Sequence, residues 1–473
     1  ENIMYRDSSR VLQQLIDQSK NKNKNTNKHQ LGLKSLALAE NVKNKSKTFA
    51  VVCETLKFKQ TIDNVLSRAK INPNKIARSL GLMYVMLYDH LFGKGIRGGG
   101  AVKRSIVGYD EQLRTALGLL MKEKGVDDAA DLVSSAIRNA PKFPRYARVN
   151  LLTATVDEVL DELKQDTALG DISVDPDIPY LLRFQTGTDL HAHPMVLNGK
   201  LILQDKSSCF PAHALYEVLK PALDKNSVIQ AIDATAAPGN KTSQLAALGL
   251  NKVFAFDKDA RRLNILKKRM VQAKADSIVE ASCRDFLSIS PSDDENLKKV
   301  KVVLLDPSCS GSGMIGRVDH LVDEEEVDAQ EETRLAGLSK FQKESLLHAL
   351  GFPNVDLVSY STCSIHKEEN ELVVEHALRS NPEFQLAVAL SSWPRRGDEN
   401  ASELDLDQTK RLVRVDPRED MTCGFFVAVF VRKGSSLLAH LWAEQAKKRK
   451  MKERRKRRRK TKVDGQKAKK VKI

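Results

Sequence analysis

The spacing of apolar positions divides the chain into stretches with different periods. From Phe49 to Ile137 apolar residues recur every three or four positions, as in the run from Ile76 to Leu87, which predicts a small helical domain. Between Pro144 and Leu203 short alternating runs flank a helical pattern, which predicts a compact α+β module. The elements predicted there are one helix and three short strands: Val156–Lys164, Tyr146–Leu151, Tyr180–Arg183 and Gly199–Leu203.

From Gln204 to about Val431 short apolar runs alternate with helical patterns. This alternation is typical of a doubly wound parallel sheet with helices on both faces. The fold class is therefore α/β, a Rossmann-like sheet preceded by the helical domain and the small α+β module. The strands predicted for this sheet are Ser227–Asp233, Lys252–Asp257, Ile278–Ser282, Val300–Asp306, Val355–Tyr360 and Gly424–Val431.

Both ends of the chain are polar. The start is rich in Lys, Asn and Gln, and it predicts a short amphipathic helix at Ser9–Ser19 followed by a disordered connection. The acidic run Asp323–Glu326 predicts a solvent-exposed insertion within Met314–Lys340. The predicted domains are a largely disordered leader (1–48), the helical domain (49–143), the α+β module (144–203), the large α/β domain (204–432) and a basic tail (433–473).

The formal charge of +16 is concentrated at the end of the chain. Between Lys447 and Lys472 there are 17 Lys and Arg against two acidic residues, a net of +15, so the rest of the chain is nearly neutral. Dense basic runs are usually disordered, and they act as nuclear addresses or as non-specific nucleic-acid arms. We therefore expect a nuclear, and specifically nucleolar, protein with a disordered tail.

Several other classes of protein are disfavoured by the sequence. The six cysteines are scattered without a CxxC pair, which favours reduced thiols over a disulfide framework. His191 and His193 lack a thiol companion, so a loop is favoured over a metal site, and we expect no metal. No apolar run reaches the length of a membrane span and no signal-peptide pattern is present, although a first residue of Glu1 leaves the natural start in question.

The first chemical signal is the turn Thr235–Lys241, which joins a predicted strand to an apolar helix. Its small residues let the backbone approach a ligand, and the helix start adds unpaired N–H groups. Asp257 follows Gly239 by 18 positions, close to the spacing at which an acid meets ribose hydroxyls. Asp285, after the third strand, is placed to reach the base of the same nucleoside. Because no GxGxxG is present, we expect a nucleoside without phosphates, such as S-adenosylmethionine.

The second signal is a pair of cysteines at two strand ends. The predicted strand Val300–Asp306 ends in an acid and is followed by Pro307-Ser308-Cys309, and the predicted strand Val355–Tyr360 runs into Ser361-Thr362-Cys363. Pro307 stiffens its turn, and nearby glycines allow close approach of a flat substrate. Ligands collect at the carboxyl ends of strands in open α/β sheets, so two thiols there predict nucleophilic chemistry. Our hypothesis is that Cys363 is a catalytic nucleophile, although spacing alone does not distinguish the roles of the two thiols.

Three segments, AxAAPGNKT (from Ala234), LLDPSCSGSG (from Leu304) and YSTCSIHKEENE (from Tyr360), resemble the motifs of the Sun (Fmu-related) family. These are S-adenosylmethionine-dependent RNA cytosine-5 methyltransferases. The segments PRYARVN (from Pro144) and LQDKSS (from Leu203) resemble the family's upstream motifs, so the resemblance covers about 144–431. The helical region with GKGIRGGG (from Gly93) is similar to the subfamily that methylates large-subunit ribosomal RNA.

The resemblance implies a role for each motif residue. Cys363 is the nucleophile that adds to carbon 6 of cytosine, Cys309 assists release of the adduct, and Asp306 hydrogen-bonds the base edge. The cofactor is held by Thr235, Ala236, Ala237, Pro238, Gly239, Asn240 and Lys241, by Asp257 and Arg262 at the ribose, by Asp285 at the adenine, and by Asp306. Lys241 is, in the alternative interpretation, a surface residue at a helix start.

Four basic residues are candidates for RNA contacts. Lys94 and Arg97 lie in a glycine-rich segment that is either a flexible helix-ending loop or a contact for RNA phosphates. Arg145 and Arg148 are either surface charges or RNA contacts. The implied partners are ribosomal RNA, in a single-stranded or remodelled form, and a pre-ribosomal particle, with a monomeric enzyme. The alternatives are a tRNA or DNA target and a non-catalytic ribosome-assembly factor.

Overall fold

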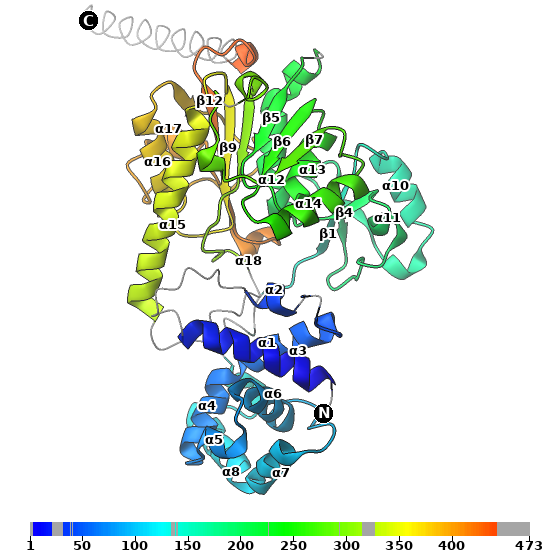
Figure 1. Cartoon of the computed structure of the whole chain (residues 1–473), viewed down its shortest axis with the longest axis vertical. Coiled ribbons are helices and arrows are strands. Elements are labelled where there is room, and N and C mark those ends of the chain that lie inside the picture. Colours follow the sequence, from blue (N-terminus) through cyan, green and yellow to red (C-terminus); the bar gives the residue numbers. More distant parts are fainter. Residues whose placement is uncertain are drawn as a thin grey trace, which may run out of the picture. The chain divides into compact units, whose positions relative to one another are not determined.

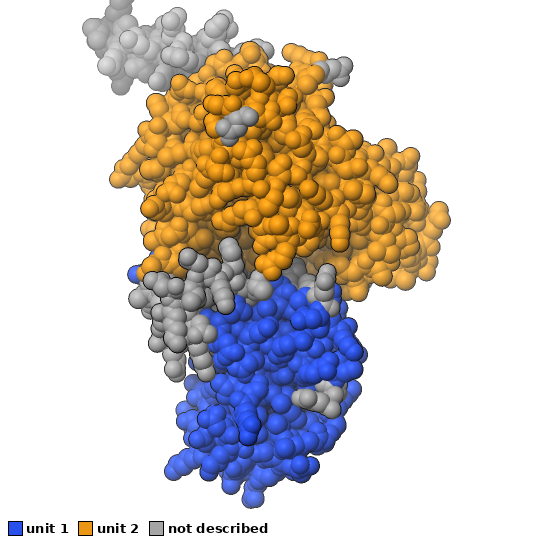
Figure 2. Space-filling model, viewed as in Figure 1, with its two compact units in different colours: residues 1–140, 316–332 blue, residues 141–315, 333–473 orange. Residues whose placement is uncertain are grey.

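The computed structural model describes residues 3–20, 32–37, 39, 41–133, 138, 141–225, 227–292, 294–314 and 327–441. The chain forms two compact units, shown in separate colours in Figure 2: unit 1 comprises residues 1–140 and 316–332, and unit 2 comprises 141–315 and 333–473. The predicted acidic run at Asp323–Glu326 and the predicted basic tail beyond residue 441 lie outside the described residues. The domain limits expected from the sequence remain predictions.

Unit 1 is helical, as the apolar spacing predicts. Ser79 caps α6 by accepting a hydrogen bond from Leu82 N at 3.3 Å, and Gly125 ends α8 in the left-handed conformation. The loop from Gly93 to Gly100 follows α6 and precedes α7. The helices are α1 (Ile3–Lys20), α2 (Leu33–Ala37), α3 (Lys45–Lys57), α4 (Lys59–Arg68), α5 (Pro73–Ile76), α6 (Leu80–Leu91), α7 (Ala101–Gly108), α8 (Asp110–Lys124) and the short η1 (Ala129–Leu132).

The leader is more ordered than the sequence predicts. The helix expected at Ser9–Ser19 is α1, which starts at Ile3, and α2 lies within the stretch predicted to be disordered. The physical reason is burial: Val11, Leu12, Leu15 and Ile16 form one apolar face that packs in the core of unit 1, against α6 and α3. Burial of this apolar face against a partner surface offsets the loss of conformational entropy that accompanies ordering of the leader. The polar composition of the leader does not reveal this burial.

Unit 2 begins with a small antiparallel sheet in the order β2-β3-β1-β4. The helix and the three strands predicted here are present, while β2 is an additional strand of only two residues. The buried side chains of β1, β3 and α10 form a core of their own. The elements are β1 (Arg145–Val149), α10 (Val156–Leu163), η2 (Thr167–Leu169), β2 (Ser173–Val174), β3 (Leu181–Phe184), α11 (Pro194–Leu197) and β4 (Leu201–Leu203).

The large sheet of unit 2 has the order β10-β12-β9-β8-β5-β6-β7, with β11 paired to β12 (Figure 1). The pairs among β5, β6, β7, β8 and β9 are parallel, and β12 is antiparallel to β9. All six predicted strands are present, so the α/β prediction is confirmed. The strands are β5 (Gln230–Asp233), β6 (Lys252–Phe256), β7 (Val279–Ser282), β8 (Val302–Leu305), β9 (Leu357–Thr362), β10 (Phe384–Leu386), β11 (Val413–Val415) and β12 (Phe425–Arg432).

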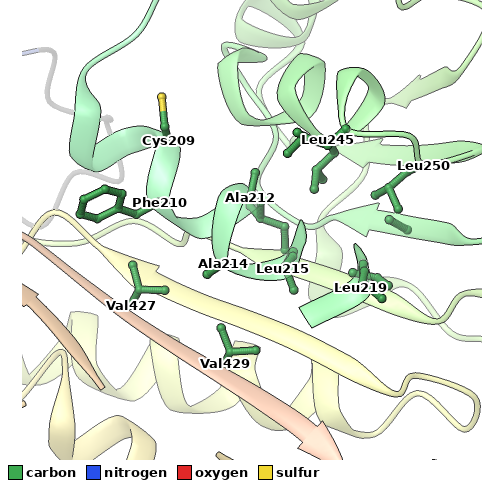
Figure 3. Packing of buried hydrophobic residues seen from close by; sticks show 14 of the residues in the cluster. Cys209, Phe210, Ala212, Ala214, Leu215, Leu219, Leu245, Leu250, Val427 and Val429 are labelled. Atoms are coloured by element: carbon green, nitrogen blue, oxygen red, sulfur yellow. The ribbon is translucent and has the colours of Figure 1, made fainter. Parts of the chain in front are cut away.

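Side chains of the sheet alternate between two cores, as the two-residue period of strands requires. On β12, Val427 and Val429 belong to one core, while Phe426 and Phe430 belong to the other. The first core includes residues of α12, α13 and α14, and Figure 3 shows Phe210, Ala214 and Leu215 of α12 on the side of β12 that carries Val427 and Val429. The second core includes residues of α15 and α16. Helices therefore cover both faces of the sheet. The loops that follow the strands lie at the ends of the sheet, where a ligand can reach them.

The helices around this sheet begin and end near the strand ends that carry the predicted motifs. Among the residues that the structure describes, no helix is long and apolar enough to span a membrane. The helical elements are α12 (Lys206–Leu223), α13 (Asn240–Ala247), α14 (Ala260–Gln272), η3 (Phe286–Ser288), η4 (Leu297–Lys299), α15 (Val327–Leu350), α16 (Glu371–Ser380), α17 (Leu406–Thr409) and α18 (Pro417–Asp420).

Candidate active site

Three adjacent parallel strands bring the predicted motifs to one edge of the large sheet. β8 lies between β5 and β9, and the chain order reverses at β5, which pairs with β6 on one side and β8 on the other. A point of reversal is where open α/β sheets bind ligands. Thr235–Lys241 follows β5, Asp306 follows β8, and Cys363 follows β9. The carboxyl ends of these strands therefore form one candidate site.

The two predicted cysteines meet in this site. Cys309 Sγ lies 3.2 Å from Cys363 Sγ, and both residues are partly exposed. The hydrogen bond with Cys363, together with burial, raises the pKa of the Cys309 thiol well above its usual value. The raised pKa keeps Cys309 protonated, so its S–H group can donate a hydrogen bond to the Cys363 sulfur. Proximity of the two thiols was expected from the strand ends, and their direct contact is added by the structure.

Asp306 links the cysteine loops to the predicted cofactor turn, Thr235–Lys241. Its side chain accepts a hydrogen bond from Ser361 Oγ at 2.6 Å and pairs with Lys241 Nζ at 2.8 Å, while its carbonyl accepts from Thr235 Oγ1 at 2.7 Å. Burial works to lower the pKa of Lys241, but Asp306 and the nearby Cys363 and Asp233 raise it overall. Lys241 therefore stays charged in the site. The alternative interpretation of Lys241 as a surface residue is wrong, because its side chain is only 15% exposed.

The turn after β5 is held by the acid that follows β6. Asp257 Oδ2 accepts a hydrogen bond from Ala237 N at 3.2 Å, and Asp257 Oδ1 accepts from Asp259 N at 2.9 Å. Arg262 donates to the Ala237 carbonyl and lies 3.6 Å from Asp257. Gly239 has a φ of +104°, and a Cβ there would come within 2.9 Å of the Met270 side chain. The positive φ therefore favours glycine at this point of the turn, and the end of the Met270 side chain would have to shift to admit a Cβ.

These residues fit a nucleoside ligand. A carboxylate offers about four acceptor positions, so Asp257 keeps capacity for ribose hydroxyl groups beside its two backbone donors. Asp285 is exposed and uses Oδ1 to accept from Leu287 N at 3.1 Å. Its other oxygen points to no described partner, which leaves an acceptor for an exocyclic amino group. The residues expected to hold the ribose and the base thus have the required acceptor chemistry.

One amide and one carboxylate near Cys363, Asn370 and Glu371, had no role in the sequence interpretation. Asn370 Oδ1 accepts from Thr362 Oγ1 at 2.5 Å, and its Nδ2 donates to Ser364 O at 2.9 Å, so it fixes both sides of Cys363. Glu371 is buried and pairs with Arg414, which donates to Ile365 O at 2.9 Å. The sequence has a helical pattern from Glu368 to Val374, but α16 begins only at Glu371, so Glu369 and Asn370 lie in a buried turn between β9 and this helix. The helical pattern does not reveal this turn.

The Cys363 loop is also packed against a second backbone segment. Gly313 N donates to Cys363 O at 3.0 Å, and Gly424 N donates to Gly313 O at 2.8 Å. A Cβ at Gly313 would lie 2.4 Å from Gly424 O, closer than any real contact. The glycines after Cys309 therefore serve close backbone approach, here to the chain itself.

Arg148 was a candidate for RNA contact, and the structure corrects this. Arg148 is fully buried, and it donates to Gln204 Oε1 at 3.0 Å and to Ser243 Oγ at 2.8 Å. Through Nε and Nη2 its guanidinium joins β1 to α13, the helix that follows Thr235–Lys241, while Nη1 is buried without a hydrogen-bond partner among the described residues. A group with no exposed surface cannot bind RNA phosphate, so Arg148 is a structural residue.

The other three basic candidates are nearer the surface. Arg145 is partly exposed, and its Nη2 lies 3.2 Å from His191 Nε2. His191, one of the two histidines considered for a metal site, therefore contacts this arginine. Lys94 and Arg97 are exposed in the glycine-rich loop of unit 1. That loop is anchored where Tyr5 OH accepts from Arg97 N at 3.0 Å. The role of these three residues in RNA binding remains a prediction.

Three family models match consecutive parts of the chain. Residues 46–133 match the N-terminal domain of NOL1/NOP2/Sun domain family member 5, and residues 143–204 match the ferredoxin-like domain of the same family member. Residues 218–431 match the 16S rRNA methyltransferase RsmB/F model. In fold, the chain resembles the crystal structure of PH0851, with a TM-score of 0.59 at 22% identity over 90% of this chain and 98% of that one.

Full-length relatives have similar sequences. The 28S rRNA (cytosine-C(5))-methyltransferase of Mus musculus is 38% identical, over 85% of this chain and 87% of the relative. The 25S rRNA (cytosine-C(5))-methyltransferase NSUN5 of Arabidopsis thaliana is 39% identical, over 85% of this chain and 68% of the relative. The Schizosaccharomyces pombe enzyme rcm1, a 25S rRNA (cytosine-C(5))-methyltransferase, is 34% identical over 84% and 86%. The motifs, the fold and these relatives together show that the chain belongs to the Sun (NOL1/NOP2/Sun domain) family of RNA cytosine-5 methyltransferases.

Proposed function

We propose that this protein methylates carbon 5 of a cytosine in large-subunit ribosomal RNA, with S-adenosylmethionine as the methyl donor. The observation that carries the proposal is the contact between Cys309 and Cys363 beside Asp306 at the switch point of the sheet. The relatives named as 25S and 28S rRNA (cytosine-C(5))-methyltransferases support the same target class.

Cys363 would act as the nucleophile. Carbon 5 of cytosine is a poor nucleophile, and addition of a thiolate to carbon 6 makes carbon 5 electron-rich. The resemblance of the Ser-Thr-Cys motif to the Sun family assigns the attack to Cys363, and the raised pKa of Cys309, which keeps that thiol protonated, agrees with this assignment. The Cys363 loop is fixed on both sides by Asn370, so the sulfur is held at the end of β9.

Asp306 and Lys241 would act on the base. Asp306 is held by Ser361 and by Lys241, so its orientation is set before the substrate arrives. A carboxylate placed in this way can accept a hydrogen bond from the amino group of cytosine, and it favours protonation of the ring nitrogen as the thiolate adds. That contact favours the electron shift which accompanies addition of Cys363 to carbon 6.

S-adenosylmethionine would supply an electrophilic methyl group for carbon 5. Thr235–Lys241 would hold its methionine and sugar, Asp257 and Arg262 the ribose, and Asp285 the adenine. After methylation, the carbon 5 proton leaves to a base and the bond between Cys363 Sγ and carbon 6 breaks, with its electron pair returning to sulfur. Cys309, 3.2 Å away, is placed to donate a hydrogen bond to the departing Cys363 sulfur.

The residues that contact RNA would include Arg145 in unit 2 and, separately, Lys94 and Arg97 in unit 1, which are partly or fully exposed. We propose action as a monomer on a pre-ribosomal particle in the nucleolus, where the basic tail would supply the address or a non-specific RNA arm. The alternative targets are a tRNA or a DNA cytosine, and the non-enzymatic alternative is an assembly factor.

The test is methyl transfer from radiolabelled S-adenosylmethionine to RNA, with total tRNA, duplex DNA and large-subunit rRNA offered separately. We expect label in 5-methylcytosine of the rRNA only, and none with Cys363→Ala. The matched control is Cys53→Ala in α3 of unit 1, which should transfer label as the wild type does. Label in tRNA or DNA alone would contradict the target, and absence of transfer to any substrate would contradict the enzyme.

A further inference from the structure

Glu369 is a fully buried carboxylate in the turn between Cys363 and α16. Charged side chains are rarely buried completely unless partners satisfy them. Glu369 Oε1 accepts hydrogen bonds from Ser310 N and Gln342 Nε2, both at 2.9 Å, and Oε2 accepts from Ser310 Oγ at 2.6 Å. These donors are neutral groups, and two of the three belong to the residue that follows Cys309.

Gln342 of α15 completes the arrangement on the other side of Cys309. Gln342 is also fully buried, and its Nε2 donates to Ser308 O at 3.0 Å as well as to Glu369. The backbone is thus held immediately before Cys309 by Gln342 and immediately after it by Glu369. Because the two side chains are bonded to each other, they form one clamp, which we define as Gln342 and Glu369.

The clamp is also tied to the strand that carries the other thiol. Tyr360 OH donates to Glu369 O at 2.5 Å, and Tyr360 is a buried residue of β9, three positions before Cys363. Glu369 therefore touches the Cys309 loop with its side chain and the Cys363 strand through its backbone. A displacement of Glu369 would change the distance between the two sulfurs.

We propose that Glu369 is a positioning residue for adduct release: with Gln342 it holds the Cys309 loop so that Cys309 Sγ stays in contact with Cys363 Sγ. The inference rests on the proposed function, because it assigns to Glu369 the geometry that the release step needs. Release breaks the bond between Cys363 sulfur and carbon 6, whose electron pair returns to sulfur while the carbon 5 proton leaves to a base. A misplaced Cys309 would slow this step more than the preceding attack by Cys363.

The carboxylate also acts on Cys309 through its charge. The hydrogen bond with Cys363 and burial are the main causes of the raised pKa of Cys309, and the charges of Asp306 and Glu369 add to it. Both effects keep the proton on Cys309, where it can meet the departing sulfur. Geometry and charge at Glu369 thus favour the same step.

The test is Glu369→Gln, which keeps the shape of the side chain but replaces an acceptor oxygen with an NH₂ donor that faces donors. We expect turnover with rRNA to fall at least about tenfold, and a covalent protein–RNA adduct to accumulate on denaturing gels, as it should for Cys309→Ala. The matched control is Glu375→Gln, since Glu375 is a buried carboxylate of α16 that accepts from Glu403 N at 3.0 Å. That variant should keep wild-type turnover without adduct.

A purely structural role is separated by two further variants. In the double variant Glu369→Gln/Cys309→Ala, the adduct should equal that of Cys309→Ala alone, because both changes act on one step. Ser310→Ala removes one hydroxyl donor to Glu369 and should accumulate a smaller amount of adduct, without the risk of a misfolded core. If Cys309→Ala accumulates adduct but neither Glu369→Gln nor Ser310→Ala does, the inference is overturned. If wild type transfers no methyl group to RNA, the proposed function itself has failed.

Discussion

A carboxylate beneath the cofactor turn should make the stability of unit 2 depend on pH. Asp233 ends β5, is 1% exposed, and accepts a hydrogen bond from Thr242 Oγ1 at 2.7 Å. Burial raises the pKa of Asp233 from 3.8 to about 7 in the folded state. The variant Asp233→Asn keeps an acceptor oxygen for Thr242 and removes the titration.

The sign follows from the direction of this shift. A carboxyl group whose pKa is raised on folding contributes stability that is present below the unfolded pKa and lost as pH rises through the folded pKa. At pH 5, about two units below the folded pKa, protonated Asp233 contributes roughly 3 kcal/mol, at roughly 1.4 kcal/mol per unit. At pH 8 the contribution is close to zero. The stability of Asp233→Asn relative to wild type should therefore rise by roughly 2–3 kcal/mol from pH 5 to pH 8.

The assay is urea unfolding of both proteins at pH 5 and pH 8, followed by circular dichroism. The control is Asp259→Asn: hydrogen bonds from the N–H groups of Arg262 and Arg261 lower the pKa of Asp259. The stability that ionised Asp259 contributes is lost only below about pH 4. The difference in unfolding free energy between Asp259→Asn and wild type should therefore be the same at pH 5 and pH 8. A difference between Asp233→Asn and wild type that stays constant from pH 5 to pH 8 would refute the reasoning.

Two other substitutions test the site and its packing. Lys241→Met should lower the initial rate of radiolabelled methyl transfer on the order of a hundredfold, because Asp306 loses the cation 2.8 Å away, while Lys252→Met, which breaks a surface pair, should not change the rate. A rate within twofold of wild type for Lys241→Met would contradict this role. Gly313→Ala should cost about 1–3 kcal/mol of unfolding free energy and most activity, because the added Cβ meets a backbone carbonyl at 2.4 Å. Gly118→Ala, on an open face of α8, should instead stabilise by about 0.5–1 kcal/mol in thermal unfolding, and equal effects would contradict the packing argument.

The long apolar runs made much of the fold predictable. Nearly every residue of β9 and β12 is buried, so both strands are visible in the sequence as apolar runs. The alternation of such runs with helical patterns predicted the α/β fold. β10 (Phe384–Leu386) and β11 (Val413–Val415) were not predicted. Each has three residues and is a strand only because it pairs with β12. Strand character that comes from a partner is absent from local sequence.

The site was predictable in its location but not in its contacts. Strand ends indicated that Cys309 and Cys363 would be neighbours, because β8 and β9 are adjacent. The clamp on Cys309 depends on Gln342, which is distant in sequence and has no pattern that marks it. Arg148 shows the same limit, since its burial depends on acceptors 56 and 95 positions away. Which charges are satisfied internally is a property of tertiary packing rather than of residue type.

The central claim is that Cys363, and not Cys309, attacks the cytosine. It is tested most directly by incubating the protein and S-adenosylmethionine with rRNA that carries 5-fluorocytosine, which has no proton at carbon 5 to lose and so traps the adduct. After digestion with nuclease and protease, mass spectrometry locates the nucleotide on one cysteine-containing peptide. We predict the added mass on Cys363, with Cys309 unmodified. An adduct on Cys309, or one that still forms in Cys363→Ala, would contradict the account.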